Sequence, residues 1–177
     1  MKLDGKKIIV TGGASGIGKA TTLEMARAGA QVFLGDVDET GGAAVQKEAQ
    51  SAGHKVDYVK LDLTDGASID RFAADVLKRA GGRIDVLVNA AGWGKVQPFV
   101  ENPPEFWDQV LAINLKGPIR LTQKILPPMF EARAGKIVNI SSDAGRVGSL
   151  GETVYSAAKG GVIAFTKSLA REAARLA

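Results

Sequence analysis

The sequence predicts an α/β fold in which a doubly wound parallel sheet carries helices on both faces. Short apolar runs rich in β-branched residues alternate along the chain with segments whose apolar residues recur every three or four positions. A glycine-rich turn joins the first apolar run directly to the first helical segment. The length of 177 residues, with 45% hydrophobic and 24% charged residues, fits a single globular domain over 1–177.

Five segments have the length and composition of buried strands. The first, KIIV, is short and β-branched, and the third, KVDYVKL, alternates between apolar and polar residues. The expected strands cover 7–10, 31–35, 55–61, 84–88 and 136–140. Each is followed by helical material, and a parallel pair of strands needs such a crossover, so we expect a parallel sheet.

The segments between the strands carry the apolar stripes of amphipathic helices. In the first of them Ile17, Ala20 and Leu23 share one face, and Gly29 suits the left-handed position that ends a helix. A proline loses its hydrogen bond and clashes one turn back, so Gly117-Pro118 predicts a break in the fourth helix. The expected helices cover 16–28, 38–52, 65–80, 103–133 and 153–175.

Composition excludes several classes of site. The chain has no cysteine and one histidine, His54, so it has no disulfide, no thiolate nucleophile and no multi-histidine metal site, and we expect no metal. The net charge is +4, but lysine and arginine are dispersed singly, which favours a solvated surface over a nucleic-acid partner. There is no signal-peptide core and no apolar run near about 18 residues, so we expect a cytoplasmic protein without a membrane span.

The glycine-rich turn TGGASGIG, residues 11–18, predicts a phosphate site. Glycines let the backbone approach a diphosphate closely, and the following helix offers N–H groups and a positive dipole end. The spacing Gly-x3-Gly-x-Gly departs from the more common Gly-x-Gly-x-x-Gly, and a glycine turn can also be a mere tight connection. Its place between a strand and a helix favours a dinucleotide. The expected contacts are Gly12, Ser15, Gly16, Ile17 and Gly18.

Asp36 closes the second expected strand, 18 positions after Gly18. A carboxylate there can accept hydrogen bonds from ribose hydroxyls, and it repels the 2′-phosphate of NADP. Neither Val37 nor Ser15 supplies the cation that a 2′-phosphate would require. We therefore expect NAD rather than NADP, although an aspartate at this place can also simply start a turn.

Three polar residues late in the chain, Ser142, Tyr155 and Lys159, suggest proton chemistry. Tyr155 and Lys159 are four apart and share a helix face. An isolated phenol stays protonated at neutral pH, and a nearby ammonium stabilises its phenolate, so the pair could exchange a proton with an alcohol or ketone. Alternatively, the tyrosine is a packed ring beside a solvated lysine, and Ser142 is an ordinary loop residue.

Taken together, these motifs resemble the short-chain dehydrogenase/reductase family, which has a Rossmann-like fold and uses NAD(P). The resemblance covers essentially the whole chain, in the family's order and spacing. It consists of TGGASGIG at 11–18, Asp36, DLTD at 62–65, NAAG at 89–92, Asn114 in INLKG, IVNISS at 137–142 and YSAAK at 155–159.

The resemblance implies a role for each matched residue. Tyr155 is expected to be the acid/base, Lys159 its activating ammonium and a ribose ligand, and Ser142 the donor to the substrate oxygen. Asn114 is expected to support a proton-relaying water, or else to be a helix-kink residue satisfied by its own backbone. Asp62 and Leu63 are expected to flank adenine. Asn89, Ala90 and Gly92 are expected to border the cofactor, with Ala90 replacing the family's usual second asparagine.

The expected substrate is a secondary alcohol or ketone, and the loops 89–93 and 141–152 favour a hydroxyacyl thioester. They are similar to hydroxyacyl-CoA dehydrogenases, 3-oxoacyl carrier-protein reductases and sugar dehydrogenases. Arg146 could meet a phosphate of an acyl carrier. The family also implies a homo-oligomer, a tetramer or dimer, that pairs the helices near 103–133 and 154–175.

Family members continue past the point where this chain ends. The resemblance calls for a sixth strand, a substrate lid and a seventh strand, so we expect a C-terminally truncated chain with 136–140 as an edge strand. The competing hypothesis is a non-catalytic dinucleotide-binding or redox-sensing module. Such a module has no need of Ser142, Tyr155 and Lys159 together.

Overall fold

A computed structural model describes residues 3–175, and these form the predicted parallel sheet. Its order is β3-β2-β1-β4-β5, and every neighbouring pair is parallel. Strand order reverses between β1 and β4, which opens a crevice at the carboxyl ends of the strands. The strands are β1 Lys7–Thr11, β2 Gln31–Asp36, β3 Lys55–Lys60, β4 Val86–Asn89 and β5 Lys136–Asn139.

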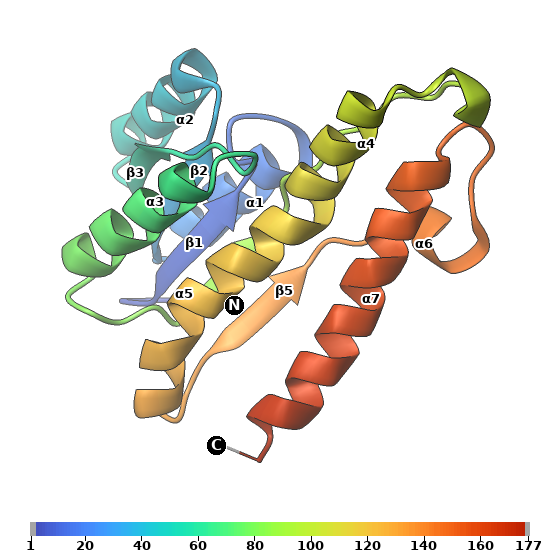
Figure 1. The fold of residues 1–177 in the computed structure, drawn as a ribbon. Coiled ribbons are helices and arrows are strands. Elements are labelled where there is room, and N and C mark those ends of the chain that lie inside the picture. The colour runs from blue at the N-terminus through green and yellow to red at the C-terminus, as the bar shows by residue number, and fades with distance from the viewer. Residues whose placement is uncertain (1–2, 176–177) are drawn as a thin grey trace.

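Helices cover both faces of this sheet (Figure 1). One apolar cluster packs α1 and α2 against Ile8 and Val10 of β1, and a second packs α3 and α5 against Ile9. The alternation of side chains along β1 thus sends neighbouring residues into separate cores. The helices are α1 Gly16–Arg27, α2 Glu39–Ser51, α3 Gly66–Arg79, α4 Pro104–Leu111, α5 Gly117–Glu131, α6 Ala144–Val147 and α7 Thr153–Ala173, with a 3₁₀ turn, η1, at Phe99–Glu101.

The helix is not broken at Gly117-Pro118, contrary to the prediction; instead it changes from α to π geometry just before these residues. A π-helical turn, η2, spans Ala112–Lys116, and α5 begins at Gly117 without an interruption of the chain's course. A π turn shifts the hydrogen-bond register by one residue, so a proline without an N–H fits directly after it. Two short elements, η1 and α6, were not predicted, since neither has enough residues for a periodic pattern.

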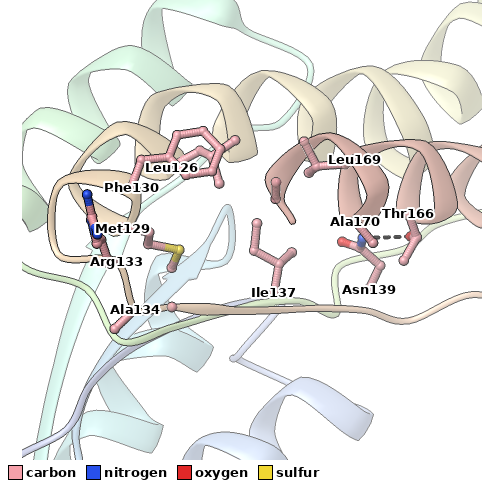
Figure 2. Close-up of a pocket in the computed structure, with 12 residues that line it drawn as sticks. Leu126, Met129, Phe130, Arg133, Ala134, Ile137, Asn139, Thr166, Leu169 and Ala170 are labelled. Carbon is pink, nitrogen blue, oxygen red and sulfur yellow. Dashed lines mark hydrogen bonds between the residues drawn. The ribbon is translucent and has the colours of Figure 1, made fainter. Parts of the chain in front are cut away.

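β5 lies at the edge of the sheet, as expected, beside an apolar groove (Figure 2). The groove has a volume of about 270 Å³ and runs between α5, β5 and α7. Its polar side chains include Arg133 and the hydrogen-bonded pair of Asn139 and Thr166, whose Nδ2 and Oγ1 atoms are 2.9 Å apart. The groove is lined by none of the predicted site residues.

Many of the dispersed lysine and arginine side chains form ion pairs at the surface. Lys19 pairs with Glu48 on α2 at 2.9 Å. Within residues 3–175, no helix combines the length and apolar character needed to cross a bilayer. Among the same residues, no three histidine or carboxylate side chains cluster closely enough to hold a metal ion.

Asp85 anchors the amino ends of β1 and β4, and its removal is expected to destabilise the fold by about 2–3 kcal/mol. Its side chain is 8% exposed and accepts a 2.9 Å bond from the Lys7 backbone N–H. Lys6 and Arg83 also donate to it. In Asp85→Ala, the Lys7 N–H loses its acceptor, and urea unfolding measures the cost. Asp75→Ala, which breaks an exposed pair with Arg79, should change stability by about 0.5 kcal/mol or less.

The effect of Asp85 should also depend on pH. Burial alone would raise the pKa of Asp85, but the bonds from Lys7, Arg83 and Lys6 outweigh burial and lower this pKa. A carboxyl whose pKa falls on folding stabilises the protein above its unfolded pKa, near 4, and stops doing so as the pH drops through the folded value. The stability gap between the wild type and Asp85→Ala should therefore shrink below about pH 4; a constant gap would contradict this assignment.

Candidate active site

A cleft of about 790 Å³ opens at the carboxyl ends of the strands. Two predicted residues, Asn89 and Asn114, are buried behind its lining, 4% and 1% exposed. The other predicted residues line it together, although they are distributed from the first strand to the last helix. They are Gly12, Ser15, Gly16, Ile17, Gly18, Asp36, Asp62, Leu63, Ala90, Gly92, Ser142, Tyr155 and Lys159.

The glycines of the first turn are required by close backbone contacts. Gly12 has φ +69°, and a Cβ on it would lie 2.7 Å from the Cα of Ala91. A Cβ on Gly18 would overlap the carbonyl oxygen of Gly12. The turn therefore folds back on the first turn of α1, and any larger residue at either position would push the two apart.

The N-terminus of α1 faces the cleft without an acceptor of its own. Ser15 occupies the N-cap position, but its side chain makes no capping bond, and no acidic residue lies in the first turn. The first N–H groups of a helix need acceptors, and the dipole there favours an anion. Together with the close-packed glycines, this donor set fits the diphosphate of a dinucleotide.

Asp36 also has a structural role that was not predicted. Its Oδ2 accepts the backbone N–H of Ala14 at 2.9 Å, and its Oδ1 accepts that of Asp38 at 3.0 Å. The carboxylate thus ties the glycine turn to the end of β2. The surroundings are anionic: burial raises the pKa of Tyr58, and the nearby charges of Glu39, Asp36 and Asp38 raise it further.

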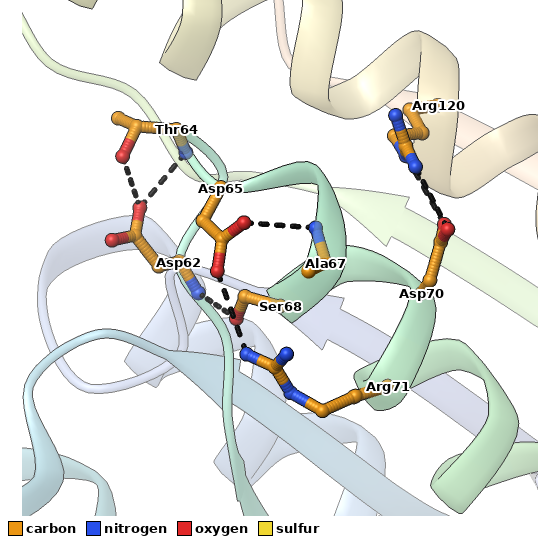
Figure 3. A network of polar contacts seen from close by, with 8 residues as sticks. All are labelled: Asp62, Thr64, Asp65, Ala67, Ser68, Asp70, Arg71 and Arg120. Atoms are coloured by element: carbon orange, nitrogen blue, oxygen red, sulfur yellow. Dashed lines mark hydrogen bonds and ion pairs between the residues drawn. The ribbon is translucent and has the colours of Figure 1, made fainter.

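A polar network shapes the turn between β3 and α3 (Figure 3). The Oδ1 of Asp62 accepts from the backbone N–H and hydroxyl of Thr64, at 2.8 and 2.6 Å, and the Asp62 N–H donates to Ser68. These bonds fix the turn that places Leu63 in the cleft wall. Further along α3, the hydrogen bonds from Arg120 lower the pKa of Asp70 to about 2 and join α3 to α5.

Tyr155 and Lys159 share one face of α7 in the cleft. The Lys159 Nζ lies 5.6 Å from the centre of the Tyr155 ring and donates to the Ile140 carbonyl at 2.9 Å. Lys159 is 4% exposed, so the alternative of a solvated lysine is wrong. Burial lowers the pKa of Lys159. Ser142, just past β5, accepts from the Ala144 N–H at 3.2 Å, which leaves its hydroxyl hydrogen free to donate.

Asn114 projects from the π turn and holds the loop after β4. Its Nδ2 donates to the Trp93 carbonyl at 2.6 Å, and its Oδ1 accepts the Trp93 N–H at 3.2 Å. It also donates to the Val110 carbonyl four residues back. Asn114 therefore does bond the backbone of its own helix, as the alternative role of a helix-kink residue requires, and it bonds the Trp93 loop as well. A Cβ on Gly92 would lie 3.2 Å from the Asn114 Oδ1 and 3.6 Å from the Lys159 Nζ, so these groups converge on one small space.

Asn89 is buried beneath the residues that line the cleft. Its Nδ2 donates to the Asn139 Oδ1 at 2.8 Å and to the Thr122 hydroxyl at 3.3 Å, which ties β4 to β5 and α5. Within the described residues its Oδ1 is buried without a partner. The side chain therefore fixes the strand ends that carry Ala90 and Gly92.

Thr11 was not among the predicted site residues. This residue is fully buried, and its hydroxyl accepts the N–H groups of Ala90 and Ala91 at 3.1 and 3.2 Å. It holds the turn after β4 over Gly12. A polar residue at the end of an otherwise apolar run was the available signal.

Known proteins resemble this chain in sequence and in fold. A family model described as short chain dehydrogenase matches residues 6–176. A 3-oxoacyl-[acyl-carrier-protein] reductase from Thermotoga maritima is 45% identical over 174 residues, which are 98% of this chain and 70% of the relative. A sorbitol dehydrogenase from Cereibacter sphaeroides is 40% identical, over 95% of this chain and 64% of the relative.

Solved structures agree with these matches. A metagenomic short-chain oxidoreductase, crystallised in complex with NADP, superposes with a TM-score of 0.94 at 36% identity. The superposition covers 98% of this chain and 79% of that chain. The likeness therefore extends over nearly all of the residues present here.

Proposed function

This chain belongs to the short chain dehydrogenase family, and from that premise we propose that its cleft interconverts a secondary alcohol and a ketone with a nicotinamide dinucleotide. One observation carries the proposal. Tyr155, Lys159 and Ser142 line the same cleft as the glycine turn and the uncapped end of α1. This shared cleft supports a proton donor acting next to a site for the cofactor's diphosphate.

The cofactor-binding residues follow from the fit described above. Gly12, Ser15, Gly16, Ile17 and Gly18 would hold the diphosphate, and Asp36 the adenosine ribose. Asp62 and Leu63 would flank the adenine, and Asn89, Ala90 and Gly92 would border the other end together with Tyr155 and Lys159. When bound, the nicotinamide supplies or accepts the hydride.

The chain's own residues would handle the proton. In ketone reduction, Tyr155 donates its hydroxyl proton to the substrate oxygen, and in alcohol oxidation it accepts that proton. The Lys159 ammonium stabilises the phenolate formed in reduction, and Ser142 donates a hydrogen bond to the same substrate oxygen. Asn114 would hold the loop after β4 through its bonds to Trp93. Its Oδ1 and the Lys159 Nζ border the same small space, and a water that relays protons would bind there.

The competing proposal, a non-catalytic dinucleotide module, does not explain the combination of Ser142, Tyr155 and Lys159 in one cleft. A binding module could use the buried Lys159 ammonium to hold a ribose, but it has no need of a serine and a tyrosine hydroxyl in the same cleft, with the tyrosine ring 5.6 Å from that ammonium. Perturbed, buried titratable groups in a cleft favour catalysis.

For the substrate, we propose a 3-oxoacyl or 3-hydroxyacyl thioester. The relative from Thermotoga maritima supports this by its name, whereas the sorbitol dehydrogenase supports a polyol. Arg146 lies four residues after Ser142, which lines the cleft, and pairs with Asp143 at 2.9 Å; we propose it as a contact for a carrier's phosphate. A homo-oligomer that pairs the helices near 103–133, which are α4 and α5, and α7 between subunits is also proposed, and light scattering tests it.

We propose NAD as the preferred dinucleotide, and Asp36→Asn tests this. The substitution removes the charge and keeps one of the two side-chain oxygens that accept the N–H groups of Ala14 and Asp38. It should lower the NAD/NADP ratio of kcat/KM by about 10-fold or more, the worth of a charged hydrogen bond. Glu48→Gln makes the same charge change on α2 and pairs only at the surface, so it should leave the ratio unchanged. An unaltered ratio in Asp36→Asn would remove the basis for choosing NAD.

A further inference from the structure

The helix α7, which carries the proposed catalytic pair, is held at the end of β5 by three consecutive residues. The Asn139 Nδ2 donates to the Thr166 Oγ1 at 2.9 Å. The next carbonyl, that of Ile140, accepts from the Lys159 Nζ at 2.9 Å. The Ser141 hydroxyl then donates to the Lys159 carbonyl at 3.0 Å. The strand end therefore holds α7 at two places, Lys159 and Thr166.

These two places are far enough apart to set the direction of the helix. Lys159 and Thr166 are seven residues apart, which is about 10 Å along the helix axis. Together with Tyr155 and Val162 they recur at the spacing of a single helix face. A helix held at one point can pivot, whereas two points fix its direction. Tyr155 lies one turn beyond Lys159, so the position of its ring depends on that direction.

Little apolar packing holds α7 near Thr166. The buried residues of α7 are Ala158, Lys159 and Val162, and all of them precede Thr166. The later turns border the groove of about 270 Å³ that separates α7 from α5 and β5, and Asn139 and Thr166 both line it (Figure 2). The bond between Asn139 and Thr166 thus bridges strand and helix beside open space, where water can replace a partner that is lost.

Both side chains of this bond are oriented by further bonds. The Thr166 hydroxyl donates to the Val162 carbonyl at 2.7 Å, which leaves its oxygen free to accept from Asn139. On the other side, the Asn139 Oδ1 accepts from the Asn89 Nδ2 at 2.8 Å. A line of hydrogen bonds therefore runs from the end of β4, beneath the cleft, through β5 to α7.

We therefore propose that Thr166 is a positioning residue for the proposed reaction. Its bond with Asn139 sets the direction of α7, and that direction holds the Tyr155 hydroxyl at the substrate oxygen. Thr166 lies outside the cleft lining and is 11 residues from Tyr155, about 16 Å along the axis, so it touches neither reactant. The proposal rests on the proposed function. A misplacement of about 1 Å costs about 100-fold in rate, so the smaller movement on losing one of two anchors should cost about 10-fold.

The test is Thr166→Val, which keeps the shape of the side chain and removes its hydroxyl. We expect kcat for reduction of 3-oxooctanoyl-N-acetylcysteamine to fall about 10-fold, because α7 can pivot. The dissociation constant for NAD should change by less than about threefold, because the glycine turn and α1 are not touched. Thr166→Ser restores an acceptor for Asn139 and should recover at least about half of the wild-type kcat. An unchanged kcat in Thr166→Val, or an equally slow Thr166→Ser variant, would overturn the assignment.

Thr122→Val is the matched control. Thr122 is buried and likewise accepts from an asparagine amide, the Asn89 Nδ2 at 3.3 Å, but it lies on α5. The variant loses the same hydroxyl without releasing α7, so it should keep kcat within about twofold of the wild type. A loss as large as that in Thr166→Val would mean that any buried threonine of this network has the same effect, and the specific role of Thr166 would be lost.

A double variant tests whether Thr166 acts through Tyr155. In a Tyr155→Phe background the tyrosine hydroxyl is already gone, so its position no longer matters. Adding Thr166→Val should then lower kcat by less than about twofold further. A loss of about 10-fold in both backgrounds would show that Thr166 acts by another route, and it would contradict the proposal.

Failure here can be told apart from failure of the proposed function. If the wild type reduces no ketone, the proposed function fails, and the anchoring of α7 is still tested by amine accessibility. Lys159 is 4% exposed, so its amine should react slowly with acetic anhydride. Peptide mass spectrometry compares its acetylation with that of Lys167, an exposed lysine on the same helix. The ratio should rise at least about fivefold in Thr166→Val and stay constant in Thr122→Val; equal ratios in all three proteins would refute the anchoring.

Discussion

Replacing Tyr155 with phenylalanine is expected to lower kcat about 10²–10⁴-fold while the dissociation constant for the dinucleotide changes by less than about twofold. The change removes the one hydroxyl that we place to exchange a proton with the substrate, and general acid–base catalysis has this order of effect. The ring stays, so the packing of Gly94 over it and of Lys159 beside it is retained. Steady-state kinetics and calorimetric titration with NAD measure the two quantities separately.

The chain contains a matched control. Its other tyrosine, Tyr58, is not in the cleft lining and donates its hydroxyl to the Asp36 carbonyl at 3.1 Å. Tyr58→Phe loses the same atom, yet it should keep kcat within about threefold, since no proton passes there. A Tyr155→Phe variant with more than a tenth of the wild-type kcat would mean that another group supplies the proton.

Gly18→Ala is expected to weaken dinucleotide binding at least 100-fold. The new Cβ would overlap the Gly12 carbonyl oxygen, so the turn and the first turn of α1 must separate. Overpacking against backbone costs about 1–3 kcal/mol, and alanine's better helix propensity returns only about 1 kcal/mol of this. The N–H groups that would hold the diphosphate are displaced by the same movement. Calorimetric titration gives the dissociation constant for NAD, and the thermal unfolding midpoint measured with and without NAD gives the stability. The two measurements together separate lost binding from lost stability.

Gly53→Ala provides the comparison for this variant. Gly53 has φ +79° and open space where its Cβ would be, in the turn between α2 and β3. Alanine there costs backbone strain of about 1–2 kcal/mol but moves nothing in the cleft. It should lower stability and leave the dissociation constant for NAD unchanged. Wild-type affinity in Gly18→Ala would place the diphosphate elsewhere.

The sheet could be predicted because its signals are local. The apolar runs, the crossovers between them and the glycine turn at 11–18 each depend on a few neighbouring residues, and they imply a parallel sheet with a site at its carboxyl ends. That placement is why residues as distant in sequence as Asp36 and Tyr155 were expected in one cleft, and both line it.

What the sequence missed depends on tertiary contacts. The π turn forms where Asn114 can bond both the Trp93 backbone and the Val110 carbonyl. The residues around Asn114 in sequence do not indicate that its side chain will contact the Trp93 loop. α6 packs against the backbone of Lys159, since a Cβ on Gly145 would lie only 2.5 Å from the Lys159 carbonyl carbon, and the Lys159 Nζ donates to the Ile140 carbonyl from the end of β5. Helical spacing alone could not tell a buried lysine from a solvated one.

The most direct test of the account is the fate of a deuterium atom. The wild-type chain is mixed with 3-oxooctanoyl-N-acetylcysteamine and NADH or NADPH deuterated on one or the other face of C4, and the alcohol is analysed by mass spectrometry. The account predicts one deuterium on the carbinol carbon from one face only, because a single cleft holds both reactants in one orientation. An unlabelled product from both faces, or equal labelling from each, would contradict it.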